Sequence, residues 1–346
     1  MGRRKRQPTS PVDWKGLTDE ELLRTRVRDL GLRIEGSAVA RRVERLYAEL
    51  DARGIAFRPG CYLADEWLCP DKEPVIGIPF YLAHPRLIRL EKRMMLEVEG
   101  GTESSCMKIL RHEAGHAVNY AYVLYRRTRW RELFGPFSAR YSDSYKAQPY
   151  SRRYVSHLQD NYAQAHPDED FAETFAVWVT PEGRWEQRYR GWPVMPKLRY
   201  VDRLMKRIGP LPPRVTARTT PWSAARMTST LAAYYQRKRR TLGEDFPGFY
   251  DPGLQRLFGA RAGAEPAEPA GKFLRRWRTR IVDTVARWTG QRKFDIDRLV
   301  GKLIRRCDDL GLSVHAAEAE AAAEVASFVT AVMNRVHGFI EDSQRT

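Results

Sequence analysis

Apolar positions recur every three or four residues in many stretches of this chain, a spacing that predicts amphipathic helices. Residues 18–21, Thr-Asp-Glu-Glu, have the spacing of a capping box and predict a helix that reaches about Leu30. The other helical patterns occupy residues 38–50, 86–98, 102–127, 167–178, 223–241, 272–290 and 315–340. We therefore expect helices to supply most of the fold.

Three segments favour extended structure instead: residues 55–59, 61–68 and 75–83, which are separated by Pro, Gly and Asp. Many prolines fall within residues 191–222, so we expect irregular chain there. The pattern as a whole predicts a mostly helical α+β fold with a small sheet. Residues 75–83 could form the edge of that sheet.

A chain of 346 residues suits two domains, because about 150 residues is a common domain size. Residues 1–16 are expected to be a disordered basic tail and residues 17–259 the main domain. The run ARAGAEPAEPAG at residues 260–271 is the best linker candidate. Residues 272–346 would then form a helical C-terminal region.

Composition excludes several classes of protein. With 42% hydrophobic residues, the chain can bury a sizeable core and is not mostly disordered. Mean hydropathy is −0.57, and no apolar run approaches the ~20 residues that a transmembrane helix needs. The basic N-terminus has no apolar stretch behind it, and four cysteines in so long a chain fit free thiols. We therefore predict a cytoplasmic protein without a transmembrane segment.

The net charge of +17 is unevenly distributed along the chain. Residues 201–300 contain 21 Lys and Arg against 9 Asp and Glu, an excess of 12 positive charges. Such a segment can be an ordinary solvated basic face. It can equally contact an anionic partner such as nucleic acid, a membrane surface or an acidic protein.

The strongest chemical signal is an HExxH motif, His112-Glu113-Ala114-Gly115-His116. Side chains four residues apart lie on one face of a helix, so the two histidines can offer both imidazoles to one zinc ion. Glu113 borders the same face and can reach a water molecule at the metal without being a ligand.

A catalytic zinc site needs a third protein ligand. Asn119 and Tyr122 stand where metzincins have Gly and His, so that arrangement is excluded. A second predicted helix begins at Pro167 and carries Glu169 and Glu173 on one face. One of these glutamates can ligate zinc while the other accepts the free N–H of a zinc-bound histidine.

The run from Glu169 to Phe175, EDFAETF, downstream of HExxH resembles the gluzincin pattern and is similar to the catalytic domain of anthrax lethal factor. Residues 55–260 more broadly resemble a bacterial family named for zinc-binding metallopeptidases. The resemblance implies a zincin-like domain in which Glu169 is the zinc ligand. It also implies that Tyr162, seven residues earlier, stabilises the oxyanion.

These residues together predict a zinc metallopeptidase that acts on a peptide or protein substrate. Glu113 would be the general base, and Tyr162 or His166 would donate to the oxyanion. Tyr162 can also be a packing aromatic, and His166 can simply cap the following helix. The alternative function is a basic nucleic-acid-binding or scaffold protein with a non-proteolytic metal site.

Overall fold

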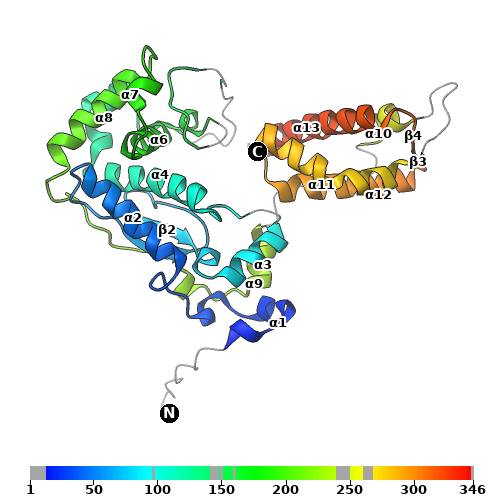
Figure 1. Cartoon of the computed structure of the whole chain (residues 1–346), viewed down its shortest axis with the longest axis horizontal. Coiled ribbons are helices and arrows are strands. Elements are labelled where there is room, and N and C mark those ends of the chain that lie inside the picture. The colour runs from blue at the N-terminus through cyan, green and yellow to red at the C-terminus, as the bar shows by residue number, and fades with distance from the viewer. Residues whose placement is uncertain are drawn as a thin grey trace. The chain divides into compact units, whose positions relative to one another are not determined.

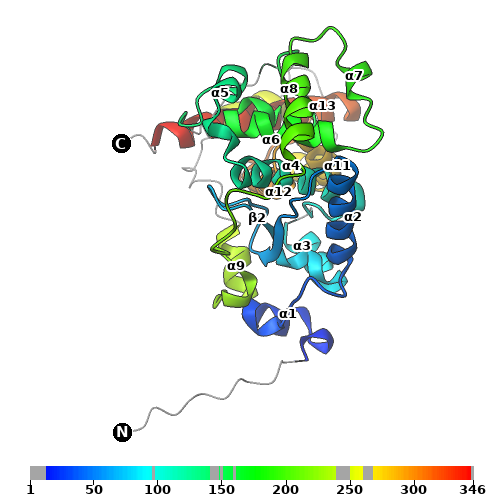
Figure 2. The same cartoon turned by 90° about the vertical axis from the view of Figure 1, so that its left-hand side faces the viewer.

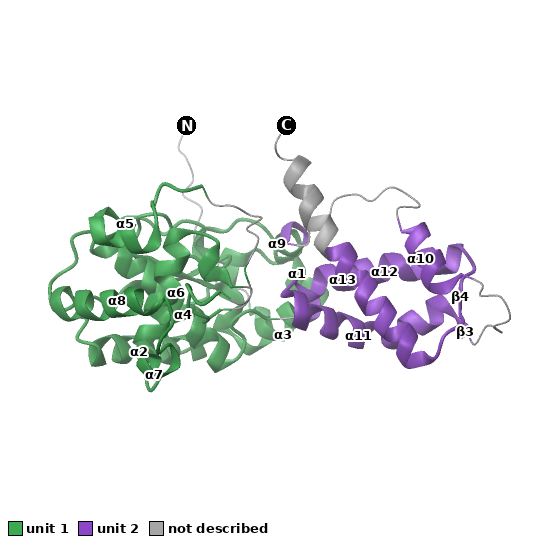
Figure 3. Ribbon diagram, turned by 90° about the horizontal axis from the view of Figure 1, so that it is seen from above, with its two compact units in different colours: residues 1–92, 98–235 green, residues 93–97, 236–346 purple. Residues whose placement is uncertain are grey.

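The computed structural model describes residues 13–95, 98–140, 148, 151–158, 161–238, 250–259 and 268–343. The chain divides into two compact units (Figure 3). Unit 1 comprises residues 1–92 and 98–235, and unit 2 comprises residues 93–97 and 236–346. Helices dominate both units and the strands are few, which confirms the mostly helical α+β fold.

The first elements of unit 1 are short. Residues 14–16, expected to belong to the tail, form the 3-10 helix η1 (Trp14–Gly16), and the Trp14 side chain is buried. The expected capping box at Thr18 is present and opens α1 (Asp19–Arg24). This helix does not continue to Leu30, because Thr25 and Val27 pair through their backbones with residues 229–231. The chain resumes as the 3-10 helix η2 (Val27–Leu30).

The small sheet contains β1 (Gly60–Ala64) and β2 (Val75–Pro79), which run parallel. On the opposite side of β2, Leu68 forms an antiparallel bridge with Gly77. The Leu68 N–H donates to the Gly77 carbonyl at 3.2 Å, and the Gly77 N–H donates back at 2.8 Å. The outer edge beside β2 is therefore the segment around Leu68, not residues 75–83 as expected.

Two helices of unit 1, α4 (Glu103–Ala121) and α6 (Pro167–Val179), lie against each other (Figures 1 and 2). Their closest approach is at Gly115. A Cβ atom added there would lie 2.7 Å from the Cα of Ala172 and 2.9 Å from its carbonyl oxygen. Only glycine fits at this crossing, because backbone atoms of α6 occupy the space of a side chain.

The sequence predicted one helix from residue 102 to 127, but α4 ends at Ala121. Two backbone amides from elsewhere, those of Arg214 and Val215, donate to the Ala121 carbonyl at 2.8 and 3.0 Å. Val123 then adopts a left-handed conformation with φ 55°, and the 3-10 helix η4 (Leu124–Arg126) follows. A tertiary contact thus terminates the helix where local pattern would extend it.

A buried ion pair fixes α4 against α2 (Ala38–Ala52) on another side. The Arg111 guanidinium donates twice to the Glu49 carboxylate, at 2.7 Å each. Both side chains are buried, and burying a charge costs free energy. The bidentate contact between Arg111 and Glu49 offsets that cost.

The rest of unit 1 surrounds this pair of helices. Residues 191–222, expected to be irregular, contain α8 (Met195–Ile208). Its apolar residues recur at helical spacing, and Pro196 is tolerated because it lies in the first turn. The remaining elements, of which α3 and α9 end with residues assigned to unit 2, are η3 (Phe80–Ala83), α3 (Pro85–Met95), α5 (Thr128–Phe134), η5 (Tyr162–Gln164), α7 (Trp185–Arg188), η6 (Ala224–Arg226) and α9 (Leu231–Lys238).

Unit 2 is a helical assembly with its own apolar core. Residues 260–267 of the expected linker lie outside the described residues, and residues 268–271 form β3 and the start of α11. Helix α10 packs into the core of this unit. The elements are α10 (Asp251–Phe258), β3 (Glu268–Pro269), α11 (Ala270–Thr289), α12 (Lys293–Asp309), β4 (Ser313–Val314) and α13 (Glu318–Ser343).

None of the helices in the described part of the chain combines the length and apolar character that a membrane span requires. All four cysteines are free thiols.

Candidate metal centre

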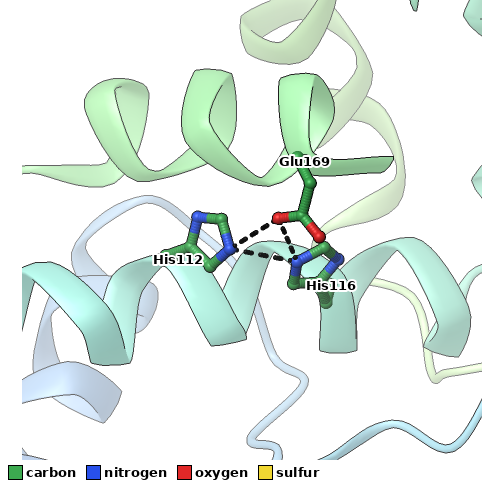
Figure 4. A group of neighbouring side chains, drawn as sticks. All are labelled: His112, His116 and Glu169. Carbon is green, nitrogen blue, oxygen red and sulfur yellow. Dashed lines mark hydrogen bonds and ion pairs between the residues drawn. The ribbon is translucent and has the colours of Figure 1, made fainter. Parts of the chain in front are cut away.

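Three buried side chains from two helices converge on one point (Figure 4). His112 and His116 project from the same face of α4, and Glu169 comes from the first turn of α6. The two Nε2 atoms are 3.1 Å apart, and Glu169 Oε2 lies 3.0 Å from His112 Nε2 and 3.2 Å from His116 Nε2. The candidate ligand atoms all lie within 4.8 Å of one another.

The far side of each imidazole is held by a further carboxylate. His112 Nδ1 lies 2.9 Å from Glu173 Oε1, and the other Glu173 oxygen accepts the Leu158 backbone N–H at 2.9 Å. Glu173 therefore lies in the position that suits a group orienting a ligand histidine. Its carboxylate is fixed by the backbone of a segment outside both helices.

His116 is oriented by Asp168, a residue that the sequence analysis did not single out. Asp168 Oδ2 lies 3.0 Å from His116 Nδ1 and also accepts the Tyr120 hydroxyl at 2.5 Å. Asp168 Oδ1 accepts the Asn119 amide at 2.6 Å. Acidic residues in the first turn of a helix are favoured by the helix dipole alone. The sequence pattern therefore gave no indication that Asp168 contacts His116.

The donor set fits a zinc ion. If each Nδ1 donates its proton to a carboxylate, both Nε2 atoms present lone pairs to each other and to Glu169. Zn–N and Zn–O bonds of about 2.0–2.1 Å in a tetrahedral arrangement separate ligand atoms by about 3.3 Å. The separations of 3.0–3.2 Å are close to that value.

The electrostatics also favour a positive charge at the centre of this cluster. Burial lowers the pKa of His112, but hydrogen bonds with Glu169 and Glu173 outweigh burial and raise the pKa to about 9. Burial likewise opposes protonation of His116, yet Asp168 and Glu169 hold its pKa well above the ordinary value. A divalent cation bound by the imidazoles can satisfy the same carboxylates.

Glu113 lies beside the cluster without belonging to it. Its side chain is buried, and burial raises the pKa of its carboxyl group. Within the described residues, the Glu113 carboxylate makes no hydrogen bond or ion pair to another side chain or to the backbone. It is therefore available to interact with a bound molecule.

The two candidate oxyanion donors differ in their surroundings. The Tyr162 ring centroid lies 5.6 Å from that of His112, and Tyr162 is 37% exposed, so it lies at the rim of the site. His166 is the N-cap of α6: its Nδ1 accepts the Asp168 N–H at 3.1 Å, and its Nε2 lies 3.0 Å from the Ala139 carbonyl. Both ring nitrogens of His166 thus have partners, and its catalytic role stays a prediction.

The helix crossing at Gly115 leads to a first prediction. Gly115→Ala should destabilise unit 1 by about 1–3 kcal/mol, although alanine favours helices by about 1 kcal/mol, because the added methyl overlaps the Ala172 backbone. Separating α4 from α6 should also lower zinc affinity. Thermal unfolding and zinc competition against a chelator measure the two effects.

Ser104→Ala, on the exposed surface of α4, is the matched control and should change neither property. A Gly115→Ala variant that melts and binds zinc like the Ser104→Ala variant would contradict the close crossing.

A buried His-His-Glu cluster of this kind defines a site that can bind a metal ion. Residues 104–186, which contain all three side chains, match the model of the family described as "Putative zinc-binding metallo-peptidase". This match supports the zinc cofactor and a peptidase activity. No curated protein and no solved structure matches the chain, so the likeness to anthrax lethal factor stays a prediction.

Proposed function

We propose that this chain is a gluzincin-type zinc peptidase that hydrolyses peptide bonds. The observation that carries the proposal is the buried group of His112, His116 and Glu169, with Glu113 beside it. The match of the surrounding residues 104–186 to a family described as zinc-binding metallo-peptidases supports the same function.

In this proposal His112, His116 and Glu169 hold the zinc ion. Glu173 and Asp168 keep the two imidazoles in the tautomer that presents Nε2 to the metal. When bound, zinc would acidify a water molecule towards a pKa of ~7 and polarise the substrate carbonyl.

Side chains of the protein transfer the protons in the proposed reaction. The Glu113 carboxylate accepts the proton of the attacking water and later delivers it to the leaving amine. Burial of Glu113 excludes competing solvent from this transfer. The Tyr162 hydroxyl donates a hydrogen bond to the developing oxyanion, which its position beside His112 at the rim of the site supports.

The substrate backbone is proposed to add to the sheet edge at Trp67–Cys69. Leu68 uses its N–H and carbonyl on Gly77, and strand alternation turns those of Trp67 and Cys69 to the outer side. Within the described residues these outer groups make no hydrogen bond. An extended peptide could therefore pair with them as a further strand.

This edge is close to the proposed metal centre. Burial raises the pKa of the Cys69 thiol, and the negative charges of Glu113 and Asp168 raise it further. Strand β2, to which Leu68 is bridged, also packs against α4, the helix that carries Glu113, so a peptide on this edge would lie beside that helix. An endopeptidase with an extended substrate fits this arrangement.

The alternative is a nucleic-acid-binding or scaffold protein with a metal site that does no proteolysis. The position of Glu113 favours the peptidase, because a purely structural site has no use for a buried carboxylate that makes no hydrogen bond within the described residues.

Metal analysis combined with an unbiased peptide-library digest of the full chain tests the function. We expect about one zinc per chain, with cleavage lost on chelation and restored by adding zinc. Stoichiometric zinc without cleavage of any library peptide would favour the non-proteolytic alternative.

A further inference from the structure

The carboxylates behind the two histidines are held in different ways. The carboxylate that orients His112 is itself fixed by a backbone N–H. The carboxylate that orients His116, Asp168, is fixed by two side chains of α4, Asn119 and Tyr120. The proposed mechanism gives these two side chains no role. We call Asn119, Tyr120 and Asp168 together the His116 clamp.

Both oxygens of Asp168 are engaged by α4. Oδ1 accepts the Asn119 amide N–H at 2.6 Å, and Oδ2 accepts the Tyr120 hydroxyl at 2.5 Å. Oδ2 also lies 3.0 Å from His116 Nδ1. Asp168 is buried, so a rotation of its carboxylate would break at least one of these contacts where little solvent can replace it.

Helical spacing places the clamp beside the ligand that it serves. Asn119 and Tyr120 follow His116 by three and four residues, so they lie next to it on the same face of α4. Asp168 directly precedes Glu169 in the first turn of α6. Neither α4 side chain supplies a converging ligand atom, so each can be changed without removing a ligand.

Asn119 has a buried carbonyl that packing alone does not explain. The residue is fully buried, and its Oδ1 atom has no hydrogen-bond donor within the described residues. A buried acceptor without a donor costs free energy. Turning the amide over would bring that oxygen against the Asp168 carboxylate, where the two oxygens would repel each other. The orientation of the amide therefore follows from its donation to Asp168.

Aromatic packing fixes the ring of Tyr120. It lies edge-on to Phe137, with ring centroids 6.2 Å apart, and to Tyr125, at 6.3 Å. Phe137 and Tyr125 in turn stack on each other at 4.4 Å. A hydroxyl on a ring that is already fixed loses little conformational freedom when it donates a hydrogen bond. Tyr120 is thus suited to hold Asp168 in one orientation.

We propose that Asn119 and Tyr120 are positioning residues for the metal ion. By holding Asp168 on Nδ1, they keep the His116 imidazole in the tautomer and orientation in which Nε2 faces zinc. Outer partners of this kind fix the ring of a ligand histidine and increase its basicity. The inference rests on the zinc site of the proposed function, but it does not depend on peptide hydrolysis.

The test is the zinc affinity of the full chain, measured by competition with a chromogenic chelator. Tyr120→Phe and Asn119→Ala each remove one donor to Asp168 and no ligand atom. Each should lower zinc affinity by about 3–10-fold, less than the ~10–100-fold that loss of an orienting carboxylate typically causes.

A double-mutant cycle separates positioning from general damage to the fold. Both substitutions are repeated in the Asp168→Ala background, where the group that they hold is absent. If Asn119 and Tyr120 act through Asp168, neither should lower zinc affinity there by more than about twofold. An effect that reached the metal by loosening the helix packing would persist in that background and add to the loss from Asp168→Ala.

Tyr125→Phe is the matched control, because it removes a hydroxyl from the neighbouring ring. Within the described residues this hydroxyl makes no hydrogen bond, so the variant should bind zinc like the wild type. Thermal unfolding of each zinc-free variant checks folding. If Asn119→Ala does not fold, Tyr120→Phe decides, since it removes a single atom.

Wild-type zinc affinity in Tyr120→Phe, or an equal loss with and without Asp168, would overturn the inference. A chain that binds no zinc would overturn it together with the proposed function. Zinc binding with the expected coupling but no cleavage of any peptide would support the clamp and contradict only the peptidase.

Discussion

Replacing Glu113 with glutamine should abolish peptide hydrolysis while zinc remains bound. Glutamine has nearly the same shape as glutamate but cannot accept the proton of the attacking water. Zinc should stay bound because the three converging ligand atoms belong to other residues. Loss of a general base typically lowers kcat by about 10²–10⁴-fold. Zinc content by elemental analysis and kcat on a peptide selected from the library measure the two halves of this expectation.

Glu103→Gln on the same helix is the matched control, because Glu103 is exposed and its ion pair with Arg45, at 2.6 Å, lies on the surface. A surface ion pair of this kind contributes little, so this variant should cleave like the wild type. If Glu113→Gln retained wild-type kcat, Glu113 could not be the base. If it lost zinc as well as activity, Glu113 would be needed to form the site rather than to transfer a proton.

Removing the Glu169 carboxylate should reduce zinc affinity more than removing Glu173 or Asp168. Glu169 contributes an oxygen to the point where the imidazoles meet, whereas Glu173 and Asp168 act through the far nitrogen of each imidazole. Losing an orienting carboxylate typically costs about 10–100-fold in metal affinity. Glu169→Ala should exceed that range, and competition with a chromogenic chelator gives the three affinities on one scale.

Glu186→Ala, an exposed glutamate on α7, should bind zinc like the wild type and controls for the loss of one negative charge. Equal affinities for Glu169→Ala and wild type would exclude Glu169 from the ligand set. A larger loss of zinc affinity in Glu173→Ala than in Glu169→Ala would make Glu173 the ligand and Glu169 the orienting carboxylate.

Local pattern was sufficient for the parts of the site that lie on one helix. The HExxH spacing places His112 and His116 on one face whatever surrounds the helix, and the same four-residue spacing pairs Glu169 with Glu173. The capping box at Thr18 and the helix starting at Pro167 were equally local, and both are present. These features depend on the backbone geometry of a few neighbouring residues.

Contacts between distant segments could not be derived in this way. In the sequence, Asp168 is explained by its place in the acidic first turn of a helix. Its contact with His116 exists because α6 packs against α4. The end of α4 at Ala121 depends on amides from residues 214 and 215, and the true sheet edge depends on Leu68 returning to Gly77. Periodicity indicates which face of a segment is buried, but not which segment buries it.

The positive charge of the chain also shows the difference between what the sequence determines and what the tertiary structure decides. The sequence by itself established an excess of 12 positive charges over residues 201–300 and the presence of a zinc-binding motif. Only the packing of α11 on α12 brought Arg275 and Arg278 together with three cations of the next helix, two of them beyond residue 300. Charge along a chain is a one-dimensional property, whereas a binding surface depends on which side chains the tertiary fold brings within a few ångströms of one another.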